Sequence, residues 1–197
     1  MGDAATLVER ARAALSARDA AQAIHDLLRE TIASAAPREL RRRLLGTEAA
    51  ERMGGIPRFG QHVLVDSPEL TMFHATLPPG FVNAPHDHRT WAVVAVYEGE
   101  ERNVFYRRRD GSITPASALV ASAPYVVAMR EDAIHAIENR LATPSYALHA
   151  YGNAHFHVAR SMWHPDTLVE QPRDDALFGS WCRDMIVRGV RLPADAG

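Results

Sequence analysis

The 197-residue chain contains no lysine, so all 22 of its basic residues are arginine. This absence excludes a Schiff-base lysine and the lysine of a phosphate-binding P-loop. The chain also has a single cysteine, Cys182, which excludes intrachain disulfides, cysteine zinc sites and redox pairs together. Any metal site must therefore use nitrogen and oxygen donors, and the unusual feature that remains is a set of 10 histidines.

Long apolar runs are absent as well. No segment approaches the about 18 to 20 consecutive apolar residues that a membrane-spanning helix needs. The first twenty residues alternate charged and apolar side chains, which is not the pattern of a signal peptide. The net charge of −2 gives no long-range attraction to nucleic acid. We therefore expect a cytoplasmic protein with neither a membrane nor a nucleic-acid partner, and the sequence leaves the oligomeric state open.

The length and composition fit one folding unit, since 47% of the residues are hydrophobic and 23% are charged. Apolar residues recur at helical spacing over residues 5–33. Pro37 breaks this pattern, and a further short helical segment runs over residues 38–46. The sequence thus predicts an N-terminal helical cap over residues 1–56.

From residue 57 to residue 173 the chain changes to short β-branched and aromatic runs separated by turn residues. About nine such runs recur at intervals of about 8 to 12 residues with no helix between them, which predicts a sandwich or barrel. The last of them spans residues 155–163. Residues 174–197 return to helical spacing and predict a closing helix. The residues expected on its buried face are Leu177, Trp181 and Met185.

An H-x-H pair at His86 and His88 is the sharpest feature of the sequence. On a strand, alternate side chains share a face, so both imidazoles would project to the same side, about 6 to 7 Å apart along the backbone. That separation lets both reach one ion. A third histidine, His135, begins another predicted strand over residues 133–139.

The spacing around this pair resembles the first motif of the cupin superfamily, in which a glycine, an H-x-H pair, a glutamate and a second glycine follow at fixed intervals. The matched positions are Gly80, His86, His88 and Gly99. The glutamate position is Ala92 or Val93, so the acidic ligand of that motif is missing. His135 and Asn139 match the second cupin motif, although Arg130 and Asp132 replace its proline and glycine.

The cupin resemblance implies an all-β core, a double-stranded β-helix barrel, which here carries an N-terminal helical cap and a C-terminal helix. It also implies a metal bound by His86, His88 and His135. A cupin with three histidines and no acidic ligand is similar to the thiol dioxygenases, of the cysteine dioxygenase and 3-mercaptopropionate dioxygenase type. The segments H-D-H-R-T-W ending at Trp91 and Y-A-L-H-A-Y-G beginning at Tyr146 resemble bacterial members.

That family resemblance implies Fe(II) as the cofactor, and a small thiol and O2 as the substrates. It assigns Tyr151 and His149 to catalysis, where Tyr151, oriented by His149, hydrogen-bonds dioxygen or the substrate carboxylate. Ala147 occupies the position of the serine in the family's Ser-His-Tyr relay. Gln61 stands where cysteine dioxygenases carry an arginine, which is the pattern of the 3-mercaptopropionate type.

Two further residues are expected to contact the substrate. Arg160 offers a bidentate guanidinium for its carboxylate, which makes it a better charge partner than Gln61. Trp91, next to the ligand strand, is the other candidate, although packing inside the barrel is the favoured role for a tryptophan at this position.

The same reaction is also chemically consistent with the three histidine ligands alone, without the family resemblance. Three neutral imidazoles leave an Fe(II) ion with a formal charge of +2 and with open positions for a substrate and O2. A metal-bound thiol is deprotonated, and its electron-rich sulfur can be oxidised past the sulfenic stage to a sulfinic acid. The expected reaction therefore converts a small thiol carboxylate, similar to 3-mercaptopropionate, to its sulfinic acid.

Several alternatives stay open at this stage. The protein could be a cysteine dioxygenase, a metal-dependent cupin enzyme acting on a non-thiol substrate, or a cupin that binds a metal or ligand without catalysis. Imidazole also suits Zn, Cu and Ni, so the sequence does not identify the metal. A second H-x-H pair, His155 and His157, competes as the primary site but lacks the leading glycine of the motif.

Overall fold

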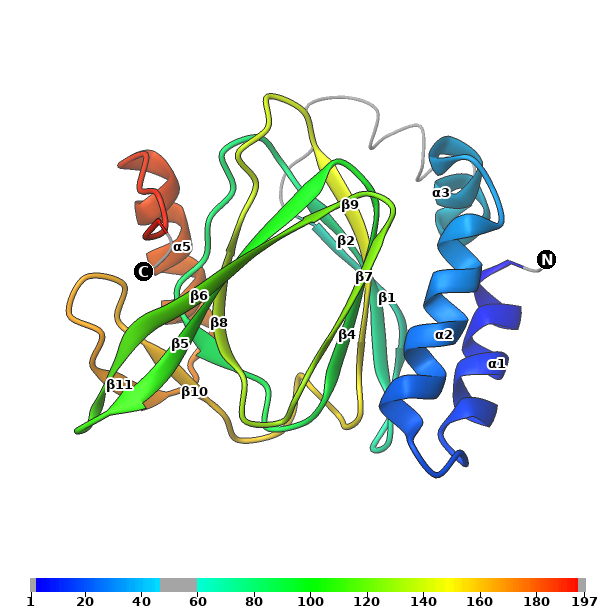
Figure 1. The fold of residues 1–197 in the computed structure, drawn as a ribbon, viewed down its shortest axis with the longest axis horizontal. Helices are drawn as coiled ribbons and strands as arrows, with labels where there is room; N and C mark the ends of the chain where they lie inside the picture. The colour runs from blue at the N-terminus through cyan, green and yellow to red at the C-terminus, as the bar shows by residue number, and fades with distance from the viewer. Residues whose placement is uncertain (1–2, 47–59, 195–197) are drawn as a thin grey trace.

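The computed structural model describes residues 3–46 and 60–194, and two antiparallel β-sheets form its centre, between three N-terminal helices and one C-terminal helix (Figure 1). The predicted boundary between the helical cap and the barrel, at residues 56 and 57, lies outside the described residues. The division of the chain into three parts stays a prediction. The helices are α1 (Ala4–Ala14), α2 (Ala20–Ala33), α3 (Pro37–Leu45) and α5 (Asp175–Val187).

Every strand pairing in the two sheets is antiparallel. The first sheet contains, in spatial order, β1 (Gly60–Asp66), β2 (Thr71–Leu77), β9 (Ser145–Tyr151), β4 (Ala92–Glu98) and β7 (Tyr125–Met129). The second contains β11 (Glu170–Pro172), β10 (Ser161–Trp163), β3 (His86–Asp87), β8 (Ile134–Glu138), β5 (Glu100–Arg109) and β6 (Ser112–Ser122).

The order of the strands defines the fold. From β2 to β9 the chain passes repeatedly between the sheets, which places β2, β9, β4 and β7 in one and β3, β8, β5 and β6 in the other. Two facing four-stranded sheets in this order form an eight-stranded jelly roll, the double-stranded β-helix. The predicted fold class, an all-β barrel with N-terminal helices and a C-terminal helix, is confirmed.

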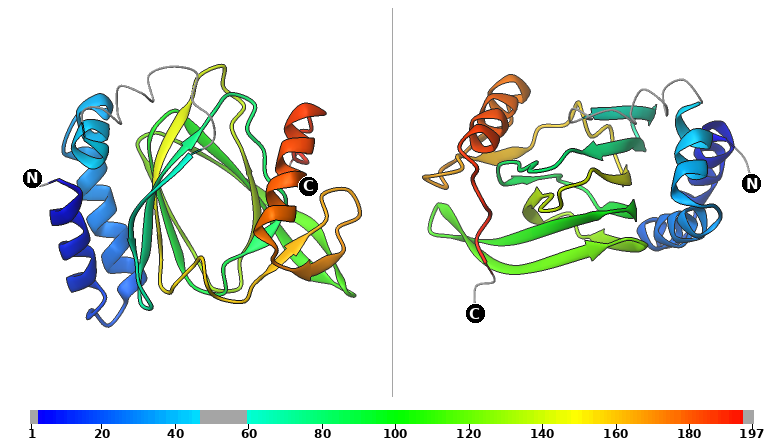
Figure 2. Two further views of the ribbon diagram at one scale, coloured as in Figure 1. Left: turned by 180° about the vertical axis from the view of Figure 1, so that it is seen from behind. Right: turned by 90° about the horizontal axis from the view of Figure 1, so that it is seen from above.

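Helices cover the barrel from opposite sides, with α1, α2 and α3 on one side and α5 on the other (Figure 2). All seven residues of β2 are buried, because one face of the strand points into the barrel and the other lies beneath the N-terminal helices. The helical pattern over residues 5–33 is interrupted before α2, where the Asp19 side chain accepts a hydrogen bond from the Gln22 backbone N–H at 3.0 Å. This N-cap starts a second helix. No helix in the described ranges is long and apolar enough to cross a membrane.

The buried face of α5 differs from the predicted one. Phe178, Cys182 and Met185 are buried, whereas Leu177 is 38% exposed. The N-cap Asp174 starts the helix so that Phe178 and Cys182 face the barrel. The prediction is therefore wrong for Leu177, whereas Met185 is buried and Trp181 packs, partly buried, against the same hydrophobic cluster.

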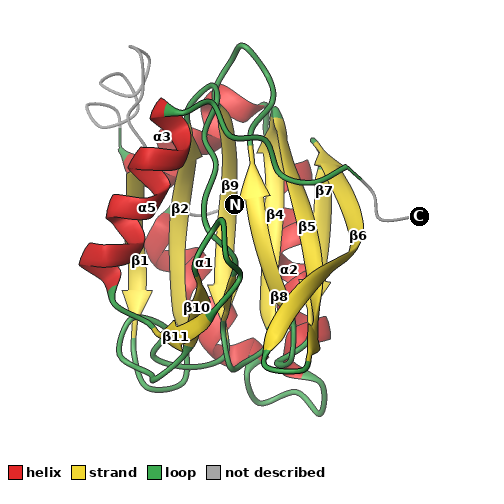
Figure 3. Cartoon of the chain, turned by 90° about the vertical axis from the view of Figure 1, so that its left-hand side faces the viewer, coloured by secondary structure: helices red, strands yellow, loops and turns green. Residues whose placement is uncertain are grey.

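The last predicted strand is also shorter than expected. Only Ser161–Trp163 of residues 155–163 forms a strand. The chain before it makes a turn, in which the His157 and Val158 backbone N–H groups donate to the carbonyl oxygen of Ala154 at 2.8 and 3.2 Å. Figure 3 shows β10 and β11 as short strands beside the longer ones of the barrel.

His74, on the outer face of β2, makes the stability of this fold depend on pH. The side chain is fully buried, its Nε2 lies 2.5 Å from the Tyr97 hydroxyl oxygen, and burial lowers its pKa from 6.5 to about 3. Because the pKa of His74 is lower in the folded state than in the unfolded chain, the unfolded chain binds a proton below pH 6.5 that the folded protein does not. The contribution of His74 to the free energy of unfolding is therefore largest above pH 6.5 and falls by about 1.4 kcal/mol per pH unit as the pH drops.

We therefore expect the free energy of unfolding of the wild type to fall more steeply between pH 7 and pH 5 than that of His74→Gln, whose side chain does not titrate. Urea unfolding at the two pH values measures this difference. The other buried histidines contribute equally to both proteins, so the comparison isolates His74. Equal losses in the two proteins would contradict the prediction.

Candidate metal centre

Strand pairing brings the three predicted ligands together. β3 pairs with β8 so that His86 lies opposite His135, and His88 follows β3 directly. The ring centroids are 4.8 Å apart for His86 and His135, 4.8 Å for His88 and His135, and 5.1 Å for His86 and His88. One nitrogen of each ring lies within 4.8 Å of the others, and all three side chains are buried. In residues 3–46 and 60–194 this is the only such group of metal-binding side chains.

The competing H-x-H pair does not converge. The His157 side chain is 69% exposed and its Nε2 lies 2.8 Å from the Asp66 carboxylate. His155 is buried, and its ring stacks on Tyr151 with centroids 3.9 Å apart. The turn that replaces the predicted strand sends the two side chains to different environments, so the pair forms no joint site.

The geometry of the three histidines fits a single ion. The Nε2 atoms of His88 and His135 are 3.2 Å apart. Two nitrogens bound at right angles to one ion, at about 2.1 Å each, lie about 3.0 Å apart. Nδ1 of His135 donates to the Asn103 side-chain oxygen at 2.7 Å, and Nδ1 of His86 donates to the Ala84 carbonyl at 3.1 Å. These hydrogen bonds leave Nε2 as the lone-pair atom of both rings.

The protonation state of the three histidines also fits metal binding. Burial lowers the pKa of His86 and of His88 well below the ordinary value. Burial also lowers the pKa of His135, to about 4. All three rings are therefore neutral near pH 7, which is the form that binds metals. The residues present thus fit a metal ion held by three imidazoles.

The sequence prediction missed a buried polar chain behind the site. The side chains of Glu101 and Asn103, two residues apart on β5, both point into the barrel, and both are buried. The amide of Asn103, whose oxygen holds His135, donates to a Glu101 carboxylate oxygen at 3.3 Å. The other Glu101 oxygen lies 3.4 Å from Nε2 of His149. Nδ1 of His149 is 3.1 Å from the hydroxyl oxygen of Tyr151. A chain of polar contacts therefore joins Tyr151 to His135, one of the three predicted metal ligands.

Nε2 of His149 faces Glu101 and lies 3.4 Å from one of its carboxylate oxygens, and both atoms are buried with no hydrogen-bond partner among the described residues. Ala147, two residues before His149 on β9, carries no hydroxyl. Burial alone raises the pKa of Glu101, but the His149 ring beside the carboxylate reverses this, and the pKa lies below the ordinary value. The carboxylate is therefore ionised at neutral pH.

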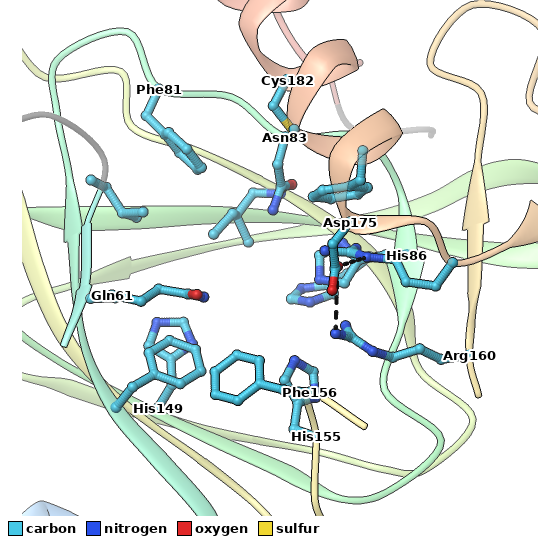
Figure 4. A pocket seen from close by; sticks show the side chains of 18 of the residues that line it. Gln61, Phe81, Asn83, His86, His149, His155, Phe156, Arg160, Asp175 and Cys182 are labelled. Carbon is cyan, nitrogen blue, oxygen red and sulfur yellow. Dashed lines mark hydrogen bonds and ion pairs between the residues drawn. The ribbon is translucent and has the colours of Figure 1, made fainter. Parts of the chain in front are cut away.

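A cavity of about 720 Å³ adjoins the three histidines (Figure 4). His86 and His135 line it, together with four of the residues expected in the site, Gln61, His149, Tyr151 and Arg160. Gln61 and Arg160 point into it from opposite sides in Figure 4. The Tyr151 ring lies 4.9 Å from that of His88, and burial raises the pKa of its hydroxyl, which keeps the proton.

Trp91 is the exception among the expected site residues. It packs with the hydrophobic cluster beneath the N-terminal helices, and its ring covers Gly152, where an added Cβ would lie 2.3 Å from the indole. Ala92, the first residue of β4, faces into the barrel, so the residue before it faces outward. The expected substrate contact of Trp91 is corrected accordingly, and its role is packing.

Comparisons with known proteins do not identify the function. No family model and no curated protein matches the sequence. The structure is similar to an RmlC-like cupin family protein with a double-stranded β-helix fold from Methanocaldococcus jannaschii (13% identity, 49% of this chain and 82% of that chain, TM-score 0.41). It is also similar to the DMSP lyase of Ruegeria pomeroyi (16% identity, 57% of this chain and 55% of that chain, TM-score 0.44). A third similar structure is an oxalate decarboxylase variant from Bacillus subtilis (19% identity, 50% of this chain and 27% of that chain, TM-score 0.41). At these identities and TM-scores the similarities carry no functional argument, and the fold assignment rests on the strand order.

Proposed function

We propose that the protein is an iron(II)-dependent dioxygenase that converts a thiol carboxylate, of the 3-mercaptopropionate type, to its sulfinic acid. The observation that carries the proposal is the donor set. Three buried, neutral imidazoles converge, and within the described part of the chain no carboxylate joins them. The same cavity holds Tyr151 and a buried arginine, Arg160.

Charge balance favours an anionic sulfur substrate at such a centre. Three neutral ligands leave the ion its full +2 charge, which a thiolate reduces. When bound, Fe(II) would keep the substrate sulfur deprotonated and activate dioxygen toward it. The overall reaction, R–SH + O2 → R–SO2H, transfers both oxygen atoms to sulfur and needs no further reductant.

The residues around the ion position the substrate. Arg160 pairs with the substrate carboxylate, and Gln61 contacts the substrate from the opposite wall. Glu101 lies within ion-pair distance of His149, and Nδ1 of His149, 3.1 Å from the Tyr151 hydroxyl oxygen, orients that hydroxyl toward the substrate.

Oxygen uptake by anaerobically reconstituted Fe(II) protein tests the proposal. We expect uptake with 3-mercaptopropionate to exceed that with cysteine, because the ammonium group of cysteine would add positive charge to a cavity that already holds Arg160. It should also exceed uptake with cysteamine, which has no carboxylate for Arg160. Uptake with none of the three thiols would contradict the proposal. Turnover of a non-thiol substrate supported by Zn or Mn would instead favour another metal-dependent enzyme built on the same ligands.

A further inference from the structure

The size of the cavity carries information about the substrate. At about 720 Å³ it lies within the about 300 to 1,000 Å³ that is typical of sites for drug-sized ligands. 3-Mercaptopropionate has only six non-hydrogen atoms. A substrate of that size would leave most of the cavity to water, although the lining is predominantly apolar.

The apolar lining is concentrated on one side. Leu77, Phe81 and Ile137 line the cavity and form a separate hydrophobic cluster in which no residue is more than 6% exposed. Phe81 and Arg160 point into the cavity from opposite sides in Figure 4. An apolar surface at this position contributes to binding only if the ligand carries an apolar group that reaches it.

The other side holds an excess of positive charge. Nε of Arg173 donates to the Asp175 carboxylate at 2.7 Å, and Nη2 of Arg160 lies 4.0 Å from the same oxygen. Both arginines line the cavity, so two guanidinium groups share one carboxylate. Nη1 of Arg173 is buried and has no hydrogen-bond partner among the described residues. Its guanidinium lies over the Phe178 ring, 3.5 Å from the centroid.

Unpaired positive charge in a largely apolar cavity is unfavourable until an anion arrives. Two planar guanidinium groups match a carboxylate in charge and geometry. The free Nη1 of Arg173 therefore indicates that the anion-binding wall includes Arg173 as well as Arg160.

We propose that the substrate is a mercapto acid with a bulky apolar group, aromatic or branched, whose carboxylate pairs with Arg160 and Arg173 while the apolar group packs on Leu77, Phe81 and Ile137. This assignment of the thiol rests on the proposed function. The division of the cavity into an anionic and an apolar subsite does not, because it follows from the lining residues alone.

Binding to metal-free protein tests the two subsites without catalysis. Calorimetric titration is carried out with 3-phenylpropionate and with propionate, which share the carboxylate and lack the thiol. We expect 3-phenylpropionate to bind about 10- to 100-fold more tightly, because burial of an aromatic ring contributes that factor. Equal affinities, or no measurable binding of 3-phenylpropionate, would overturn the proposal.

Matched variants assign the subsites to residues. Arg173→Gln should weaken binding of 3-phenylpropionate about 10-fold or more, whereas Arg130→Gln, at an arginine whose side chain is 89% exposed, should change nothing. Phe81→Ala should lower the preference for the aromatic acid. Because Phe81 is buried and its loss could affect folding, Ala75→Leu, which fills the cavity, serves as a second variant with the same expected result. Unchanged binding in Arg173→Gln and an unchanged preference in both cavity variants would contradict the assignment.

Turnover separates this inference from the proposed function. Fe(II)-reconstituted protein is supplied with 3-mercaptopropionate and with 2-benzyl-3-mercaptopropionate, and we expect kcat/KM to be at least about 10-fold higher for the benzyl acid. Turnover of the small thiol alone would overturn the inference and leave the proposed function standing. Turnover of neither thiol, together with tight binding of 3-phenylpropionate, would support the two subsites and contradict the thiol dioxygenase function.

Discussion

Replacing His135 by alanine is expected to abolish tight metal binding and to reduce metal-dependent activity by more than about 100-fold. Loss of an outer partner of a metal ligand already costs about 10- to 100-fold in affinity or activity, and removal of the ligand itself costs more. Nε2 of His135 lies 3.2 Å from that of His88, and no other described side chain joins the group of three. Metal content after dialysis and oxygen uptake measure the two effects.

A matched control is His157→Ala, because His157 is exposed and pairs with Asp66 outside the group. This variant should retain its metal and its activity. If His135→Ala kept the activity of the wild type while His157→Ala lost it, the centre would have to be placed at the second H-x-H pair instead.

Glu101→Gln is expected to reduce activity by about 10- to 100-fold at pH 7 to 8 while the metal content stays close to that of the wild type. The amide keeps the shape of the side chain and its contact with Asn103 but removes the charge beside His149. Without that charge the His149 ring loses the partner that holds it against Tyr151, so the Tyr151 hydroxyl is positioned less well toward the substrate.

The pH profile, with the metal content as the check on folding, tests this role. Because the pKa of Glu101 lies below its ordinary value of 4.5, the wild-type carboxylate stays ionised throughout the range from pH 6 to 8. The amide of the variant does not titrate either, so its activity relative to that of the wild type should be equally low throughout this range. Glu100→Gln, at the neighbouring and less buried residue, is the control. A Glu101→Gln activity equal to that of the wild type, or a relative activity that changes between pH 6 and pH 8, would refute this role of the charge.

Local spacing was sufficient to predict only part of the three-histidine group. His86 and His88 share a face because side chains alternate on extended backbone, and the pattern holds although β3 itself ends at Asp87. Their meeting with His135 depends on the antiparallel pairing of β3 and β8, which no periodicity shows. The match to two cupin motifs supplied that long-range information.

The residues that the sequence did not reveal depend on contacts between distant segments. The cupin motif expects a carboxylate at Ala92 or Val93, and Glu101 lies outside that motif. The sequence feature that indicates its role is its position two residues before Asn103 on a strand, which places both side chains on the buried face of that strand. Arg173 gave no signal, because its place in the cavity depends on how α5 packs against the barrel. Trp91 shows the reverse error, since proximity to His88 in sequence did not place it on the same face.

The fate of molecular oxygen tests the central claim most directly. Fe(II)-reconstituted protein is incubated under ¹⁸O2 with 3-mercaptopropionate and with its benzyl derivative, and the product is analysed by mass spectrometry. The three-histidine thiol dioxygenase described above predicts a sulfinic acid that carries two ¹⁸O atoms, and no such product from His135→Ala. A wild-type protein that consumes no oxygen, or forms only disulfide, would contradict it.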